Sequence, residues 1–282
     1  MMDNLKLMYI ANRPDVARIA EDAGVDRIFV DMEYIGKDLR QGGMDTVQSH
    51  HTVQDVVRLR KSLKTAELMV RCNPIHTATA DYGSSQEEIE SIIAGGADVI
   101  MLPYFKTPAE VEKFVRLVDG RAKTFPLVET REAVECIDDI LKIGGIDEIY
   151  IGLNDLSLSY GYRFMFQLLA NGTVDKLAER FRNAGLPFGF GGIASLDKGM
   201  LPGRYVLMEH YRLGSSRVIL SRSFCNLATA ESLEQVNAVF CKGVQDIRQM
   251  EHLCKTTELD YEENHRIVQE KVAQIVEEIE GI

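Results

Sequence analysis

The feature that most constrains this fold is a regular alternation of short apolar runs, rich in β-branched residues, with amphipathic helical segments. Such alternation is typical of stacked βαβ units and a parallel sheet. The pattern predicts eight strands, at residues 5–10, 27–31, 67–71, 99–102, 124–128, 148–151, 188–190 and 218–220. It predicts helices between them at residues 14–23, 53–62, 86–94, 108–118, 131–142 and 174–183.

The chain could close these strands into a barrel or leave them as an open, doubly wound sheet. Eight strands within about 220 residues match the usual length of a (β/α)8 barrel. An open dinucleotide-binding sheet would carry a G-x-G-x-x-G motif after its first strand, and none is present there. We therefore predict a single (β/α)8 TIM barrel over residues 1–225.

Two segments depart from the even rhythm of strands and helices. Residues 36–51 form a long polar insertion after the second strand, and insertions of this length are usually functional or disordered. Residues 226–282 form a C-terminal helical extension, with helices predicted near 232–254 and 261–280. The extension is expected to pack either on its own barrel or on a neighbouring subunit.

Composition limits the partners. The net charge of -11 and the pI near 5.1 count against nucleic acid or an anionic membrane as partner. The five cysteines are scattered without a CxxC pair, which argues against a disulfide framework and a cysteine-rich zinc site. We find no signal peptide and no stretch long enough to span a bilayer, so a cytoplasmic location is expected.

Polar residues cluster where the predicted strands end, and the active site of a (β/α)8 barrel lies at those ends. The second strand ends in Asp31 and is followed by Glu33, and the third ends in Arg71 and is followed by Asn73. Glu129 follows the fifth strand, and Gly152, Leu153, Asn154 and Asp155 follow the sixth. After the seventh strand, Gly191 would allow a ligand to approach the backbone closely.

Glu129 and Asp155 follow neighbouring strands, so we expect their carboxylates to lie near each other. Carboxylates without a His or Cys partner are hard oxygen ligands, suited to Mg²⁺ or Mn²⁺. The alternative is that each acid stabilises the N-terminus of the helix that follows it. A guanidinium at Arg71 needs an anionic partner, which is either a substrate carboxylate or a structural acid such as Glu33 or Glu129.

The motifs at these strand ends resemble those of the HpcH/HpaI aldolase and citrate lyase beta-subunit family, over roughly residues 5–225. The stretches that carry the resemblance are Val30-Asp31-Met32-Glu33, Arg71-x-Asn73-Pro74, Met101-Leu102-Pro103, Leu127-Val128-Glu129-Thr130-Arg131-Glu132-Ala133 and Ile151-Gly152-Leu153-Asn154-Asp155-Leu156-Ser157. The resemblance implies a divalent metal held by Glu129 and Asp155 and chelated by a 2-oxo acid. It implies that Arg71 neutralises charge on the oxygen that becomes the enolate, and that the protein is a homo-oligomer.

One position departs from the pattern of the pyruvate aldolases in this family. They have a histidine directly after the acid of the second strand, where this chain has Tyr34. Either the reaction differs or the general base comes from elsewhere. The candidates are His50 and His51, at the end of the insertion, and His76, which follows the Arg71-x-Asn73-Pro74 stretch. Solvated loop histidines are the alternative. Glu33 is a further acid/base candidate, or it orients water on the metal.

These observations favour a metal-dependent carbon–carbon lyase of the class II aldolase type, acting beside a pyruvate-like enolate. Lysine Schiff-base chemistry is the other route to such cleavage, and Lys106 is the only lysine near a predicted strand end that we retain for it. An acyl-CoA or citrate-lyase-like ester lyase is an alternative function, as is a barrel that binds a metabolite without turning it over.

Overall fold

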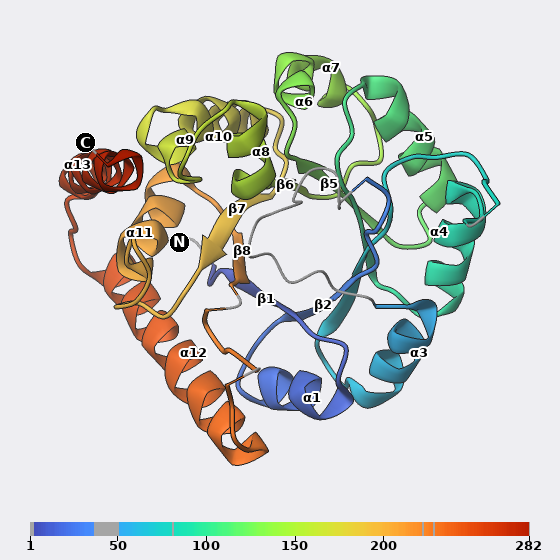
Figure 1. Cartoon of the computed structure of the whole chain (residues 1–282), viewed down its shortest axis with the longest axis horizontal. Helices are drawn as coiled ribbons and strands as arrows, with labels where there is room; N and C mark the ends of the chain where they lie inside the picture. Colours follow the sequence, from blue (N-terminus) through green and yellow to red (C-terminus); the bar gives the residue numbers. More distant parts are fainter. Residues whose placement is uncertain (1–2, 37–50, 81, 222, 228, 282) are drawn as a thin grey trace.

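Eight parallel strands close into a barrel, and the helices form a ring around it (Figure 1). The computed structural model describes residues 3–36, 51–80, 82–221, 223–227 and 229–281. The strands are β1 (Lys6–Ile10), β2 (Arg27–Asp31), β3 (Glu67–Arg71), β4 (Val99–Leu102), β5 (Lys123–Val128), β6 (Ile149–Ile151), β7 (Phe188–Ile193) and β8 (Arg217–Leu220). Each strand pairs with the next and β8 pairs with β1, which confirms the predicted (β/α)8 barrel.

The ring contains the predicted helices together with others that the pattern did not indicate. The predicted ones are α1 (Pro14–Asp22), α3 (Val53–Ser62), α4 (Ser85–Ala94), α5 (Pro108–Val118), α10 (Thr173–Asn183), α12 (Leu233–Thr256) and α13 (Tyr261–Glu280). The helix predicted at 131–142 is divided at Cys136 into α6 (Arg131–Glu135) and α7 (Ile137–Ile140). Sequence reasoning missed α8 (Leu153–Ser159), α9 (Gln167–Ala170) and α11 (Gly203–Leu213).

Local capping explains why several helices begin where the sequence predicted. The Ser84 hydroxyl accepts a hydrogen bond from the backbone N–H of Glu87, whose side chain accepts from Ser84 in return. Thr107 and Glu110 form the same reciprocal pair at the start of α5, where Pro108 occupies the first helical turn. These contacts satisfy N–H groups that a helix N-terminus leaves without intrahelical partners.

The end of the barrel opposite the predicted site is closed by a buried ionic network. The fully buried Arg27 donates to both carboxylate oxygens of Glu148, at 2.8 and 3.1 Å. Its Nη2 also donates to Glu67 at 2.6 Å, and Arg217 pairs with Glu148 at 2.9 Å. Because four strands or their flanking residues contribute charges, this network links opposite sides of the barrel at its N-terminal end.

Above this network, apolar side chains fill the barrel, and a tyrosine forms the floor of the space at the other end. Phe29, Met69, Met101 and Phe125 belong to this inner layer and are fully or almost fully buried. The Tyr150 hydroxyl donates to the carbonyl oxygen of Gly191 at 2.5 Å and accepts from the backbone N–H of Ile219 at 2.9 Å. Tyr150 therefore ties β6 to β7 and β8 beneath the predicted site.

Both C-terminal helices pack on the barrel of their own chain. In Figure 1, α12 lies beside α1, and α13 lies outside α11 and α9, in agreement with the residue contacts. The buried Glu251 of α12 accepts hydrogen bonds from the backbone N–H of Leu5, at 2.6 Å, and from the Tyr211 hydroxyl. The α12 helix thereby fills the gap that would otherwise separate α11 from α1.

The cysteines and the helices agree with two expectations from composition. None of the five cysteines, all of which lie in the described ranges, forms a disulfide. Burial raises the pKa of the Cys72 thiol well above its ordinary value, so this thiol stays protonated and unreactive. Within the described ranges, every helix is too short or too polar to cross a lipid bilayer.

Candidate functional site

A cavity of about 360 Å³ opens at the carboxyl ends of the strands, above Tyr150. Seven of the residues predicted from the sequence line it: Arg71, Glu129, Gly152, Leu153, Asn154, Asp155 and Gly191. Strands β3, β5, β6 and β7 end at this one place because all eight strands run in the same direction around a closed barrel. Because the active site of a (β/α)8 barrel lies at this end of the strands, we take this space as the candidate site and call it the catalytic cavity.

Arg71 is held by an acid on the neighbouring strand. The parallel register aligns Asp31 with Arg71, and the carboxylate receives Nε and Nη2 of the guanidinium, each at 2.8 Å. Glu33, which is almost completely buried, lies 3.4 Å from the same Nε. Burial alone would lower the pKa of Arg71, but the carboxylates of Asp31, Glu33 and Glu129 raise it well above its ordinary value. The guanidinium is therefore a fixed, permanent cation.

Glu129 is anchored by a backbone group in an unusual conformation. Its Oε1 accepts a hydrogen bond from the N–H of Tyr104 at 2.9 Å, and the side chain is buried. Tyr104 follows β4 and has a φ of 49°, in the left-handed region that residues with a side chain rarely adopt. Such backbone strain tends to occur at functional sites. Here it turns the Tyr104 N–H toward the carboxylate.

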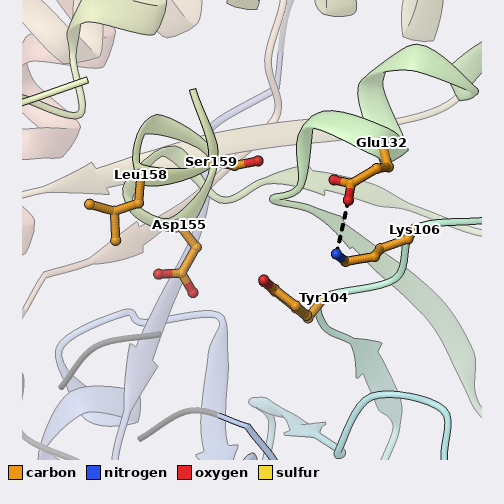
Figure 2. A pocket seen from close by; sticks show the side chains of 6 residues that line it. All are labelled: Tyr104, Lys106, Glu132, Asp155, Leu158 and Ser159. Carbon is orange, nitrogen blue, oxygen red and sulfur yellow. Dashed lines mark hydrogen bonds and ion pairs between the residues drawn. The ribbon is translucent and has the colours of Figure 1, made fainter. Parts of the chain in front are cut away.

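Asp155 lies in the first turn of α8, directly after β6. The side chain is 8% exposed, and its Oδ1 accepts a hydrogen bond from the Asn154 amide at 3.3 Å. Besides the catalytic cavity, Asp155 lines a second pocket of about 230 Å³ together with Tyr104, Lys106 and Glu132. Figure 2 shows the Asp155 carboxylate and the Tyr104 hydroxyl directed into this shared space.

Gly152 lies between the two acids in sequence and against one of them in space. A methyl group at this position would lie 2.9 Å from Oε2 of Glu129 and 3.0 Å from its Cβ. The backbone of Gly152 has a φ of -82°, which any residue can adopt, so the glycine is not needed for its conformational freedom. The missing side chain instead leaves room for the Glu129 carboxylate.

Three other predicted residues, Glu33, His51 and Asn73, lie around the cavity and are not among the residues that line it. His51 is buried, and its Nδ1 accepts the backbone N–H of Asp31 at 3.0 Å. The side-chain oxygen of Asn73 accepts hydrogen bonds from the backbone N–H groups of Tyr34 and Ile35, and its side-chain NH2 donates to Glu88 at 2.9 Å. These bonds fix the backbone that follows β2. His50 and most of the insertion at 36–51 lie outside the described residues.

Tyr34 directly follows Glu33, at the position where the family resemblance led us to expect a histidine. Burial, followed by the nearby negative charges of Asp31, Asp55 and Glu88, raises its pKa to about 12. The phenol therefore stays protonated at neutral pH. It can donate a hydrogen bond but cannot serve as a general base there.

Lys106, the remaining candidate for Schiff-base chemistry, is exposed and paired. Its ammonium lies 2.9 Å from Glu132, as Figure 2 shows, and 5.5 Å from the centre of the Tyr104 ring. The hydrogen bond with Glu132 raises its pKa above the ordinary value. A lysine that forms Schiff bases needs the opposite shift, because the neutral amine is the nucleophile.

Sequence reasoning missed the roles of Asp31 and Tyr104. Asp31 was recognised as a strand end, but only the register of β2 with β3 identifies it as the partner of Arg71. The sequence signal that could have identified this pair is that Asp31 and Arg71 are the last residues of two adjacent predicted strands. We find no sequence signal for the left-handed backbone of Tyr104.

Comparisons with known proteins find relatives in sequence and in fold. A hydroxypyruvate/pyruvate aldolase from Roseovarius nubinhibens is 24% identical to the chain over 198 residues, which cover 65% of this chain and 74% of that protein. The solved structure of an HpcH/HpaI aldolase from Desulfitobacterium hafniense superposes with a TM-score of 0.59 at 17% identity, covering 87% of this chain and 93% of the other.

The citrate lyase beta subunit from M. tuberculosis, solved with oxaloacetate and magnesium, superposes with a TM-score of 0.57 at 16% identity, covering 84% of this chain and 97% of that one. At these identities the two structures support the barrel fold alone. The family model for HpcH/HpaI aldolase/citrate lyase matches residues 6–166, more than half of the 282 residues. The chain therefore belongs to the HpcH/HpaI aldolase/citrate lyase family.

Proposed function

We propose that this protein is a divalent-metal-dependent carbon–carbon lyase that breaks or forms the bond next to the enolate of a pyruvate-like 2-oxo acid. The observation that supports this most directly is that Arg71, Glu129 and Asp155 line one cavity. Two carboxylates can hold a divalent cation, and that cation together with the fixed guanidinium would stabilise negative charge on an oxygen next to the reacting carbon.

The acidic pair fits Mg²⁺ or Mn²⁺. Both carboxylates are buried, both face the same cavity, and Gly152 leaves open the space beside Glu129 that a side chain would fill. No group of three or more His, Cys, Asp or Glu side chains in the described ranges could share an ion, so substrate and water would complete the coordination. Bound there, the metal would supply Lewis-acid stabilisation of the enolate.

The protein's own residues would bind and orient the substrate. Because Asp31 binds one edge of the Arg71 guanidinium, through Nε and Nη2, the remaining N–H groups keep one direction, from which they can pair with a substrate oxygen. Gly152, Leu153, Asn154 and Gly191 line the same cavity and would form the wall against which the small oxo acid lies. The raised pKa of Lys106 favours the metal-dependent route over a route through a lysine Schiff base.

The proposal is tested by proton exchange at the methyl group of pyruvate. Enolate formation removes a methyl proton, so purified protein with Mg²⁺ in deuterated water should replace these protons by deuterium, as followed by NMR. Binding of pyruvate or oxalate without exchange would instead support a barrel that binds a metabolite without turnover. If the protein neither exchanges the methyl protons nor binds pyruvate, the proposal is overturned.

We expect Gly152→Ala to lower the exchange rate on the order of 10²-fold. The added methyl group would displace the Glu129 carboxylate, and displacements of about 1 Å can cost this much in rate. The matched control is Gly144→Ala, because a methyl group at Gly144 meets no atom within 4 Å. Equal rates for both variants in the NMR assay would show that the space beside Glu129 is unimportant.

We further expect Glu33 to matter more than His51 for proton transfer. Glu33→Gln should lower exchange on the order of 10²-fold, the usual contribution of a general acid or base, with a smaller effect on pyruvate affinity. His51→Ala should cost about tenfold, because His51 contacts Asp31 and thereby positions Arg71. The control is the exposed His252, as His252→Ala. Wild-type exchange in Glu33→Gln would contradict its assignment.

A further inference from the structure

A third cavity, of about 220 Å³, adjoins the catalytic cavity. Three residues, Met165, Gly192 and Ser221, line both spaces. The third cavity lies between the segment that joins α8 to α9, the loop that follows β7 and the end of β8. We call it the side cavity. A molecule bound at Arg71, Glu129 and Asp155 could extend into it past Gly192.

The side cavity is lined mainly by apolar groups. Phe166, Leu201 and Val206 contribute buried side chains, and Phe164 packs edge-to-face on Phe166 with ring centres 5.4 Å apart. Two serine hydroxyls, of Ser221 and Ser223, are the polar side chains among the described residues that line it. An apolar cavity of roughly 150 Å³ is large enough to bind benzene. The side cavity therefore has room for an aromatic ring or a branched alkyl group.

The pocket on the other side of Asp155 is more polar, although Leu158 also lines it. It contains Tyr104, Glu132, Ser159 and Lys106, whose ammonium is neutralised by Glu132 at 2.9 Å. Among the described residues that line the three cavities, Arg71 and Lys106 are the basic side chains, and both are ion-paired. A second carboxylate at the far end of a substrate would therefore meet no cation among the described residues that line the side cavity. A neutral apolar group would be desolvated there favourably.

We propose that the side cavity binds the apolar substituent of the carbonyl partner, so that the enzyme joins or separates pyruvate and an uncharged aldehyde with an aromatic or branched substituent. This inference rests on the proposed lyase function. In the forming direction, the pyruvate methyl carbon loses a proton and bonds to the aldehyde carbon, and the aldehyde oxygen gains a proton. The product is a 4-hydroxy-2-oxo acid, and cleavage reverses each of these changes.

The test compares benzaldehyde with hydroxyacetaldehyde as partners of pyruvate. Ala194 lines the side cavity and is half-buried, so Ala194→Leu would occupy part of the space without overfilling the core. Met200 lines the same cavity and is 58% exposed, so Met200→Asp would place a charge beside the apolar group without burying it in the core. For each variant, the ratio of kcat/KM for benzaldehyde to that for hydroxyacetaldehyde should fall about tenfold or more. The matched control is the exposed Ala109, as Ala109→Leu, which should leave the ratio unchanged.

The outcomes separate this inference from the function on which it rests. A wild-type protein that exchanges the protons of pyruvate, with a ratio that falls in both variants and not in Ala109→Leu, supports the side cavity as the aldehyde subsite. A wild-type protein that exchanges these protons, with a ratio that neither variant changes, overturns the subsite alone. Absence of exchange in the wild type overturns both proposals.

Discussion

In Glu129→Gln and Asp155→Asn, we expect Mn²⁺ binding to be lost and exchange of the pyruvate methyl protons to fall at least about 10³-fold. Each change replaces a charged oxygen ligand by a neutral amide of the same shape. Losing one group that stabilises charge in the transition state lowers a reaction rate about 10²–10³-fold. The fold should survive Glu129→Gln, because the amide oxygen of the new side chain can still accept the Tyr104 N–H that Glu129 accepts at 2.9 Å. Calorimetric titration with Mn²⁺ and the NMR exchange assay measure the two effects.

The control for this pair is Glu132→Gln, three residues beyond Glu129. Glu132 is exposed and pairs with Lys106 outside the catalytic cavity, so its loss should change neither Mn²⁺ affinity nor exchange appreciably. Mn²⁺ affinity equal to that of the wild type in either Glu129→Gln or Asp155→Asn would contradict the assignment of the metal ligands. Arg71 would then have to bind an anionic ligand other than a substrate held by this metal.

The largest effect on stability is expected at the other end of the barrel, where Arg27→Met should lower the free energy of unfolding by about 3–5 kcal/mol. The change removes the cation that binds both oxygens of Glu148 and leaves buried carboxylates with fewer partners. Urea unfolding followed by circular dichroism measures the loss. The control is Arg60→Met, which breaks an exposed pair with Asp98 and should cost less than about 1 kcal/mol.

This network also predicts how stability responds to acid. Burial would raise the pKa of Glu67, but Arg27, Lys123 and Lys6 outweigh it and lower that pKa from 4.5 to about 2. A carboxylate with a lowered pKa in the folded state stabilises the fold above its unfolded pKa and loses this effect as the pH falls. The difference between the wild type and Arg27→Met should therefore shrink between pH 4.5 and about 2. A difference that stayed constant over this range would contradict the charge pairing.

Local sequence patterns were sufficient to predict the barrel. Strands such as Arg27–Asp31 and Glu67–Arg71 have the predicted bounds, because a buried parallel strand is a continuous apolar run with a polar residue at its end. The starts of α4 and α5 lie within one residue of the predicted positions, because Ser84 and Thr107 cap these helices. The pattern failed for α8 and α9, which are too short to show a helical period, and for α11, whose start at Gly203 carries no side-chain cap.

The sequence by itself determined the eight parallel strands in chain order and the set of polar residues at their carboxyl ends, because strand direction and chain order are local properties once each βαβ unit forms. Only the tertiary structure decided which of those residues meet. The register of β2 with β3 paired Arg71 with Asp31, and the left-handed backbone of Tyr104 anchored Glu129. Packing of the α8–α9 segment against the loop after β7 produced the side cavity. These contacts join residues distant in sequence, and such contacts depend on how the whole chain packs rather than on any local pattern.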